Sequence, residues 1–142
     1  MKRANAQSKQ QGVMLLEALV GILIFSIGIL AMLGMQAVGM RNTIDSKYRS
    51  EAAYLANQIV GTMWVDRANI ATYDDSATAN ARRAAWNNKV IATLPQDPAD
   101  PTITAPSITI AVRQATVIVR WERPGETTVS SYSVVTEIND PT

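Results

Sequence analysis

The chain has 142 residues, 47% of them hydrophobic, and a formal net charge of +1, which supports a single domain. It contains neither cysteine nor histidine, which excludes disulfides, nucleophilic Cys–His and Ser–His arrangements and the usual zinc ligand sets. The near-neutral charge gives no electrostatic footprint for nucleic acid. We therefore expect no nucleic-acid partner, no cofactor, no metal and no enzymatic activity.

The N-terminal part contains a long apolar segment. Between Ala18 and Met40 no residue carries a formal charge, and Ser26 and Gln36 are the only clearly polar side chains. At a helical rise of ~1.5 Å per residue this segment spans roughly 34 Å, enough to cross a hydrocarbon core of ~30 Å. Residues 1–12 carry three cations and no acid, which favours a cytoplasmic N-terminus with everything after about Met40 across the membrane; the cations are Lys2, Arg3 and Lys9.

One carboxylate, Glu17, lies immediately before this uncharged segment, five residues after Gly12. An ionised side chain costs ~2.5–3.5 kcal/mol at the centre of a membrane-spanning helix and less near its end. Glu17 is therefore either a boundary residue at headgroup level or an acid that needs a cation from another molecule. Cleavage after Gly12 would create such a cation, the free amine of Val13 on a neighbouring copy.

The short basic leader, the glycine, four apolar residues, the glutamate and the long apolar run resemble the class III signal of type IV prepilins. The stretch Leu15–Val20 is most similar to minor pilins of the type IV pilus modification protein (PilV) family. The resemblance implies that prepilin peptidase cuts after Gly12 and N-methylates Val13, and that Glu17 sets the register between subunits. Two departures are that Val13 replaces a frequent phenylalanine or methionine, and that no proline interrupts the apolar segment.

The resemblance implies a structural subunit that contributes to the initiation or tip complex of a type IV pilus and to twitching motility. Its partners would be prepilin peptidase, the major pilin and other minor pilins, and the inner-membrane assembly platform. It would be a single-pass protein of the bacterial inner membrane with a periplasmic C-terminal domain, and later part of the filament. The alternatives are a minor pseudopilin of a type II secretion or DNA-uptake system, and a tip adhesin or ligand-binding module. An ordinary secretory signal peptide, cut near Ala37-Val38-Gly39, leaves Glu17 unexplained.

Residues 1–12 are predicted to be an unstructured leader, and residues 13–66 are predicted to form one helix. Its first half, 13–40, is apolar on all sides and would lie in lipid or in the core of a filament. Its second half, 41–66, is amphipathic and should pack on a folded domain. The apolar stripe of this half steps by three or four residues; it comprises Ile44, Tyr48, Ala52, Leu55, Ile59 and Met63.

Residues 67–106 form the predicted connection from the helix to the sheet. A polar loop leads to Ser76, a suitable N-cap for a short helix over 76–94, and a proline-rich stretch follows. The apolar side of this helix comprises Ala85, Trp86, Val90, Ile91 and Leu94. Its Arg82 and Arg83 are expected to face water.

Acids and a tryptophan in this region could suggest a binding site. The pairs Asp74-Asp75 and Asp97…Asp100 lack the alternating spacing of oxygen ligands in a calcium loop, so we expect solvated acids. Trp86 beside two arginines could stack a base of single-stranded DNA, but we interpret it as a core residue next to exposed arginines.

Residues 107–142 are predicted to form an antiparallel sheet of three to four strands, because apolar residues alternate with polar ones at a period of two. Pro124-Gly125 is a strong turn signal, whereas Gln114-Ala115 is a poor hairpin turn between the first two strands. The third strand should place Tyr132, Val134, Thr136 and Ile138 on one face. The expected fold is α+β and pilin-like, with one long N-terminal helix on a small sheet.

Overall fold

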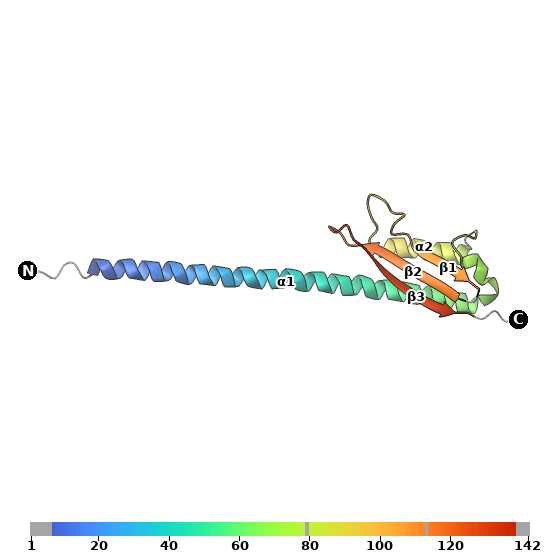
Figure 1. Ribbon diagram of the computed structural model, residues 1–142, viewed down its shortest axis with the longest axis horizontal. Helices are drawn as coiled ribbons and strands as arrows, with labels where there is room; N and C mark the ends of the chain where they lie inside the picture. The colour runs from blue at the N-terminus through green and yellow to red at the C-terminus, as the bar shows by residue number, and fades with distance from the viewer. Residues whose placement is uncertain (1–6, 79, 113, 139–142) are drawn as a thin grey trace, which may run out of the picture. The chain divides into compact units, whose positions relative to one another are not determined.

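The computed structural model describes residues 7–78, 80–112 and 114–138. The elements are the helix α1 (Gln7–Val65), the 3-10 helix η1 (Arg67–Tyr73), the helix α2 (Ala81–Thr93) and the strands β1 (Ser107–Ala111), β2 (Gln114–Glu122) and β3 (Val129–Glu137) (Figure 1). The chain divides into two compact units, Met1–Thr43 and Ile44–Thr142.

The first unit contains the N-terminal part of α1. The helix begins at Gln7, so the prediction that residues 1–12 are unstructured is wrong from that residue on, and residues 1–6 lie outside the described part. The physical reason is that glutamine and lysine are good helix formers and that an existing helix extends at little cost. Ser26 donates its hydroxyl proton to the Ile22 carbonyl over 2.7 Å, which satisfies this polar group inside the apolar segment.

The second unit is α+β, and its core forms where the C-terminal part of α1 packs on the sheet. The predicted stripe is confirmed for its last four members, which are at most 1% exposed (Ala52, Leu55, Ile59, Met63). Ala56 joins them, and Tyr48 packs against the core from its margin. Ile44 remains 40% exposed. The core stripe therefore begins one turn later than the sequence pattern predicts.

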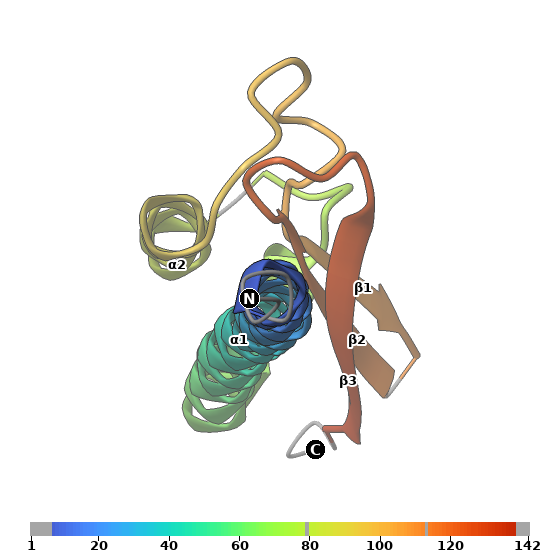
Figure 2. The ribbon, with the colours of Figure 1, turned by 90° about the vertical axis from the view of Figure 1, so that its left-hand side faces the viewer.

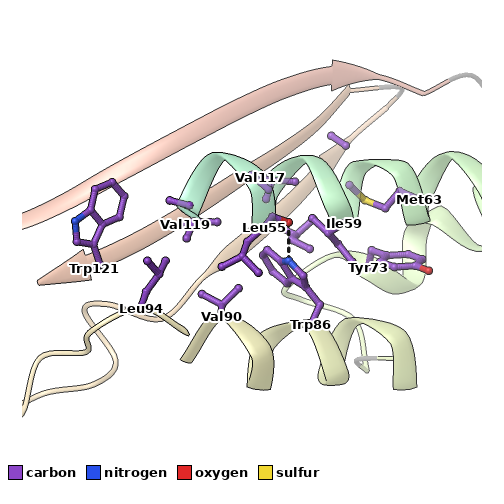
Figure 3. Close-up of a cluster of buried hydrophobic side chains, with 14 of the residues drawn as sticks. Leu55, Ile59, Met63, Tyr73, Trp86, Val90, Leu94, Val117, Val119 and Trp121 are labelled. Carbon is purple, nitrogen blue, oxygen red and sulfur yellow. Dashed lines mark hydrogen bonds between the residues drawn. The ribbon is translucent and has the colours of Figure 1, made fainter. Parts of the chain in front are cut away.

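Within the described part of the chain, the sheet has three strands in the order β1-β2-β3, all antiparallel. The inner face of β2 is almost fully buried, as the alternation predicts; it comprises Ala115, Val117, Val119 and Trp121. In this unit α1 lies between α2 and the sheet (Figure 2). Side chains from all three layers interdigitate in the core (Figure 3).

The connection from α1 to α2 differs from the prediction in two ways. Part of the expected loop is the 3-10 helix η1, which buries Tyr73 completely. The N-cap of α2 is Asn80, whose side-chain oxygen accepts a hydrogen bond from the Arg83 amide over 2.8 Å. The Ser76 hydroxyl donates to the carboxylate of Asp74 instead. Ser76 is therefore engaged in a turn of its own, and α2 starts later than predicted.

The two hairpin turns also differ in how well the sequence predicts them. Gly125 has φ 83, and the Glu126 amide donates to the Arg123 carbonyl over 3.0 Å, as the Pro-Gly signal predicts. In the first hairpin, Gln114 and Ala115 pair with β1 and belong to β2. The connection therefore precedes Gln114 and includes Val112, which adopts φ 59.

Candidate functional site

The predicted processing site lies at the start of α1. Gly12, Val13 and Glu17 are on continuous helical backbone, and Val13 and Glu17 are four residues apart and so lie on one face of the helix. Both side chains are exposed. Among the residues whose side chains are described, Glu17 forms no ion pair. The structure thus leaves this carboxylate accessible to a cation from another molecule.

Gly12 has no packing role within the described fold. A Cβ atom placed on it would meet no heavy atom within 4 Å. Glycine in a helix interior costs ~1 kcal/mol relative to alanine. Nothing in the described fold therefore requires a glycine at this position.

The apolar segment that follows is fully exposed within its own unit. Every residue from Gly12 to Thr43 is exposed, including large side chains such as Phe25 and Leu30. By length and composition, α1 is long and apolar enough to span a membrane. An exposed apolar surface of this extent marks a contact with lipid or with other proteins.

Asp75 is exposed and Asp74 half-buried, so both acids contact water as predicted, but both also bind the outer edge of β1, which the sequence does not predict. The Ile110 amide donates to one carboxylate oxygen of Asp74 over 2.6 Å. The Ile108 amide donates to the Asp75 carboxylate over 3.2 Å, and the Asp75 amide donates to the Ile108 carbonyl over 2.9 Å. We call this arrangement the Asp74–Asp75 clamp. It satisfies edge-strand backbone groups that would otherwise be open to another strand.

The clamp also explains why Arg83 is buried, although the sequence predicts that it faces water. Arg83 is 7% exposed, and its guanidinium forms an ion pair with Asp75 and donates to the Asp74 carbonyl over 2.6 Å. The prediction failed because its partners lie eight and nine residues earlier, across a turn. Hydrogen bonds from Ser76 and then from the Ile110 amide lower the pKa of Asp74 to about 2.

A second polar cluster joins the end of α1 to η1 and α2. Arg82 forms an ion pair with Asp66 at 2.9 Å, and its own side chain is 58% exposed, so here the prediction of a water-facing arginine is confirmed. The Tyr73 hydroxyl donates to Asp66 over 3.0 Å. Hydrogen bonds from Asn69 and Tyr73 lower the pKa of Asp66, and burial raises the pKa of Tyr73. The cluster is a structural junction.

The acids of the proline-rich stretch organise its turns. Asp97 accepts hydrogen bonds from the amides of Asp100 and Ala99, which lower its pKa. Burial, and then the nearby charge of Asp97, raise the pKa of Glu122. Among the described residues, no group of three or more acids could hold a metal ion.

Trp86 is a core residue, as the sequence analysis concludes. It is 5% exposed, and its indole nitrogen donates to the Leu55 carbonyl over 2.8 Å (Figure 3). Trp86 also lines an open pocket of ≈ 270 Å³ between α1 and α2, beside Arg82 and Lys89. With only 5% of its surface exposed, the ring offers no stacking platform for a base. Ala85 and Ile91, predicted to face the core, are exposed.

Comparison of the chain with protein-family models, with curated proteins and with solved structures gave no match.

Proposed function

We propose that the protein is a minor pilin of the PilV type, a structural subunit that contributes to the initiation or tip complex of a type IV pilus. The observation that carries the proposal is the start of α1, where an exposed Gly12-Val13 and an exposed Glu17 precede an apolar helix that is long enough to span a membrane. Nothing else in the described residues explains a glycine and a lone acid at these positions.

The apolar part of α1 gives the subunit two environments of similar energy. In the membrane, lipid covers the side chains of the segment 13–40. In a filament, the same side chains pack against equivalent helices, so that apolar burial is exchanged and not lost. Contacts between such helices depend on close packing, which small residues such as Ala18, Gly21 and Gly28 permit.

Glu17 would set the register of this packing. After cleavage, the amine of Val13 is a cation at the end of the helix, and the carboxylate of a neighbouring copy or of a related subunit can pair with it. A buried carboxylate without a partner is strongly penalised, whereas a paired one is tolerated. Only an axial position that brings the two groups together is therefore stable.

The proposal includes a location and a set of partners. The subunit would be a single-pass protein of the bacterial inner membrane, with its N-terminus in the cytoplasm and its C-terminal domain in the periplasm, before it enters the filament. Prepilin peptidase, the assembly platform, the major pilin and other minor pilins would be its partners. The same start of α1 also fits a minor pseudopilin of a type II secretion or DNA-uptake system. Loss of incorporation on deletion of one machine and not of the other would separate these two candidates.

The intact mass of the chain tests the proposal. Expression together with a prepilin peptidase should remove residues 1–12 and add one methyl group to Val13, and expression without it should leave the full mass. Gly12→Leu should block both changes, while Gly21→Leu, a matched change in the same helix, should leave them intact. Cleavage near Gly39, or no cleavage, would contradict the proposal.

A further inference from the structure

The peptide bond between Gly12 and Val13 lies inside a helix. α1 begins at Gln7 and continues through both residues. In an α-helix the carbonyl of residue 12 accepts a hydrogen bond from the amide of residue 16, and the neighbouring turns shield the carbonyl carbon. Hydrolysis of this bond needs access to that carbon, and it needs donors from the enzyme at the carbonyl oxygen. A peptidase therefore cannot cut the helical form of this segment.

The part of α1 before this bond is its weaker side. The first turn contains no acidic residue, although acids there stabilise a helix through its dipole. The amides of the first turn also have no partner within the helix. Gly12 follows, and glycine is the least favourable residue in a helix interior after proline. A Cβ atom on Gly12 would meet nothing within 4 Å, so no packing interaction offsets this weakness.

The part of α1 after this bond is its stronger side. Val13 is followed by Met14, Leu15 and Leu16, of which methionine and leucine are good helix formers. α1 is long and apolar enough to span a membrane from here on. In lipid, a backbone group that loses its helical partner finds no water to replace it. The helix therefore opens most easily from the end before Gly12.

We infer that residues 7–12 form an unwinding segment, a marginal stretch of helix that must open before the bond after Gly12 is cut and whose stability sets the rate of processing. The inference rests on the proposed function, since it takes prepilin peptidase as the enzyme. Gly12 acts here as a positioning residue, because it lowers the cost of opening next to the bond. A leader without helical structure would need no such step.

Paired substitutions in the unwinding segment test the inference. The full chain in detergent micelles would be incubated with purified prepilin peptidase, and the intact mass would be followed over time. Gln10→Gly should be processed about five-fold faster than Gln10→Ala, which is the ~1 kcal/mol difference in helix propensity converted to a population of the open form. The wild type should lie between them, because the helix propensity of glutamine does.

A second pair and a control pair show whether helix stability is the cause. Ser8→Gly and Ser8→Ala should differ in the same direction as the variants of Gln10, because both positions lie in the unwinding segment. Gln36→Gly and Gln36→Ala make the same exchange in α1 far beyond the bond. These two variants should be processed at equal rates.

Hydrogen exchange of the full chain without peptidase gives a readout that contact with the enzyme does not change. Opening of residues 7–12 frees the amides of residues 13–16, whose helical acceptors are the carbonyls of residues 9–12. These amides should exchange faster in Gln10→Gly than in Gln10→Ala. A contact between the peptidase and the side chain of residue 10 would alter the rate of processing and leave this exchange unchanged.

The outcomes separate the two proposals. Equal processing rates of glycine and alanine variants at residues 8 and 10, the reverse order, or different rates without different exchange would overturn the unwinding segment while the processed wild type still supports the pilin pathway. A wild type that keeps its full mass with the peptidase would refute the pilin pathway, and the inference with it.

Discussion

Val112 is the residue at which local backbone strain is most evident. Its φ of 59 lies in the left-handed region, which is unfavourable for a β-branched side chain, and its side chain is 99% exposed. No packing interaction in the described fold compensates for this conformation. The strain follows from the two-residue connection that the pairing of Ala111 with Gln114 imposes.

Val112→Asn should therefore stabilise the folded chain by about 1 kcal/mol, because asparagine tolerates this region at lower cost. Thermal unfolding followed by circular dichroism measures the effect as a rise of the midpoint by a few degrees. Val135→Asn is the matched control, since Val135 is an exposed valine within a strand, where the change should destabilise. An unchanged or lower midpoint for Val112→Asn would show that the turn is not strained.

At the scale of elements, the Asp74–Asp75 clamp decides how η1, α2 and β1 meet. The folded pKa of Asp74, about 2, is below its ordinary value of 3.8. Its ionised form therefore contributes stability at and above pH ~4, and this contribution is lost as the pH falls towards the folded value. The pKa values of Asp66 and Asp97 are lowered too, and that of Glu122 is raised. The contribution of Asp74 is therefore obtained only from the difference in pH dependence between the wild type and a variant of Asp74.

Asp74→Asn should lower the free energy of unfolding at pH 7, because one amide oxygen cannot replace two charged acceptors. Its stability should also fall less than that of the wild type between pH 4 and pH 2. Denaturant unfolding at a series of pH values measures both effects. Glu137→Gln, at an exposed position of β3, should follow the wild type. If the curve of Asp74→Asn coincides with that of the wild type throughout, the clamp makes no net contribution to stability.

The elements show what sequence reasoning can and cannot reach. The buried stripe of α1 and the alternation of β2 follow from periodicity alone, because burial of one face imposes it. The N-cap of α2 does not follow from periodicity, since Ser76 and Asn80 are both suitable caps. The hydrogen bond from Ser76 to Asp74 leaves Asn80 as the cap. The prediction that Arg83 faces water fails for a similar reason, because its partners are brought to it by a turn that the sequence pattern does not reveal.

At the scale of the whole molecule, the chain combines two units with different requirements. The unit Ile44–Thr142 has a closed core without disulfides, built from α1, α2 and the sheet. The unit Met1–Thr43 has an apolar surface and no core of its own, because all its described side chains are exposed. It therefore depends on surroundings that the chain does not supply. The candidate site at Gly12, Val13 and Glu17 is readable from the sequence since its residues are contiguous, whereas the extension of α1 back to Gln7 emerges only from the structure.

The central claim is that Glu17 positions this subunit in a filament, and the amount of the chain in sheared, purified filaments tests it most directly. The wild type should be present in the filaments, and Glu17→Ala should be processed and inserted in the membrane normally but reduced in filaments by ten-fold or more, about 1.4 kcal/mol of lost pairing. Glu51→Ala, a matched removal of an acid from the same helix, should incorporate like the wild type. Equal incorporation of Glu17→Ala, or absence of the processed wild type from filaments, would contradict the account.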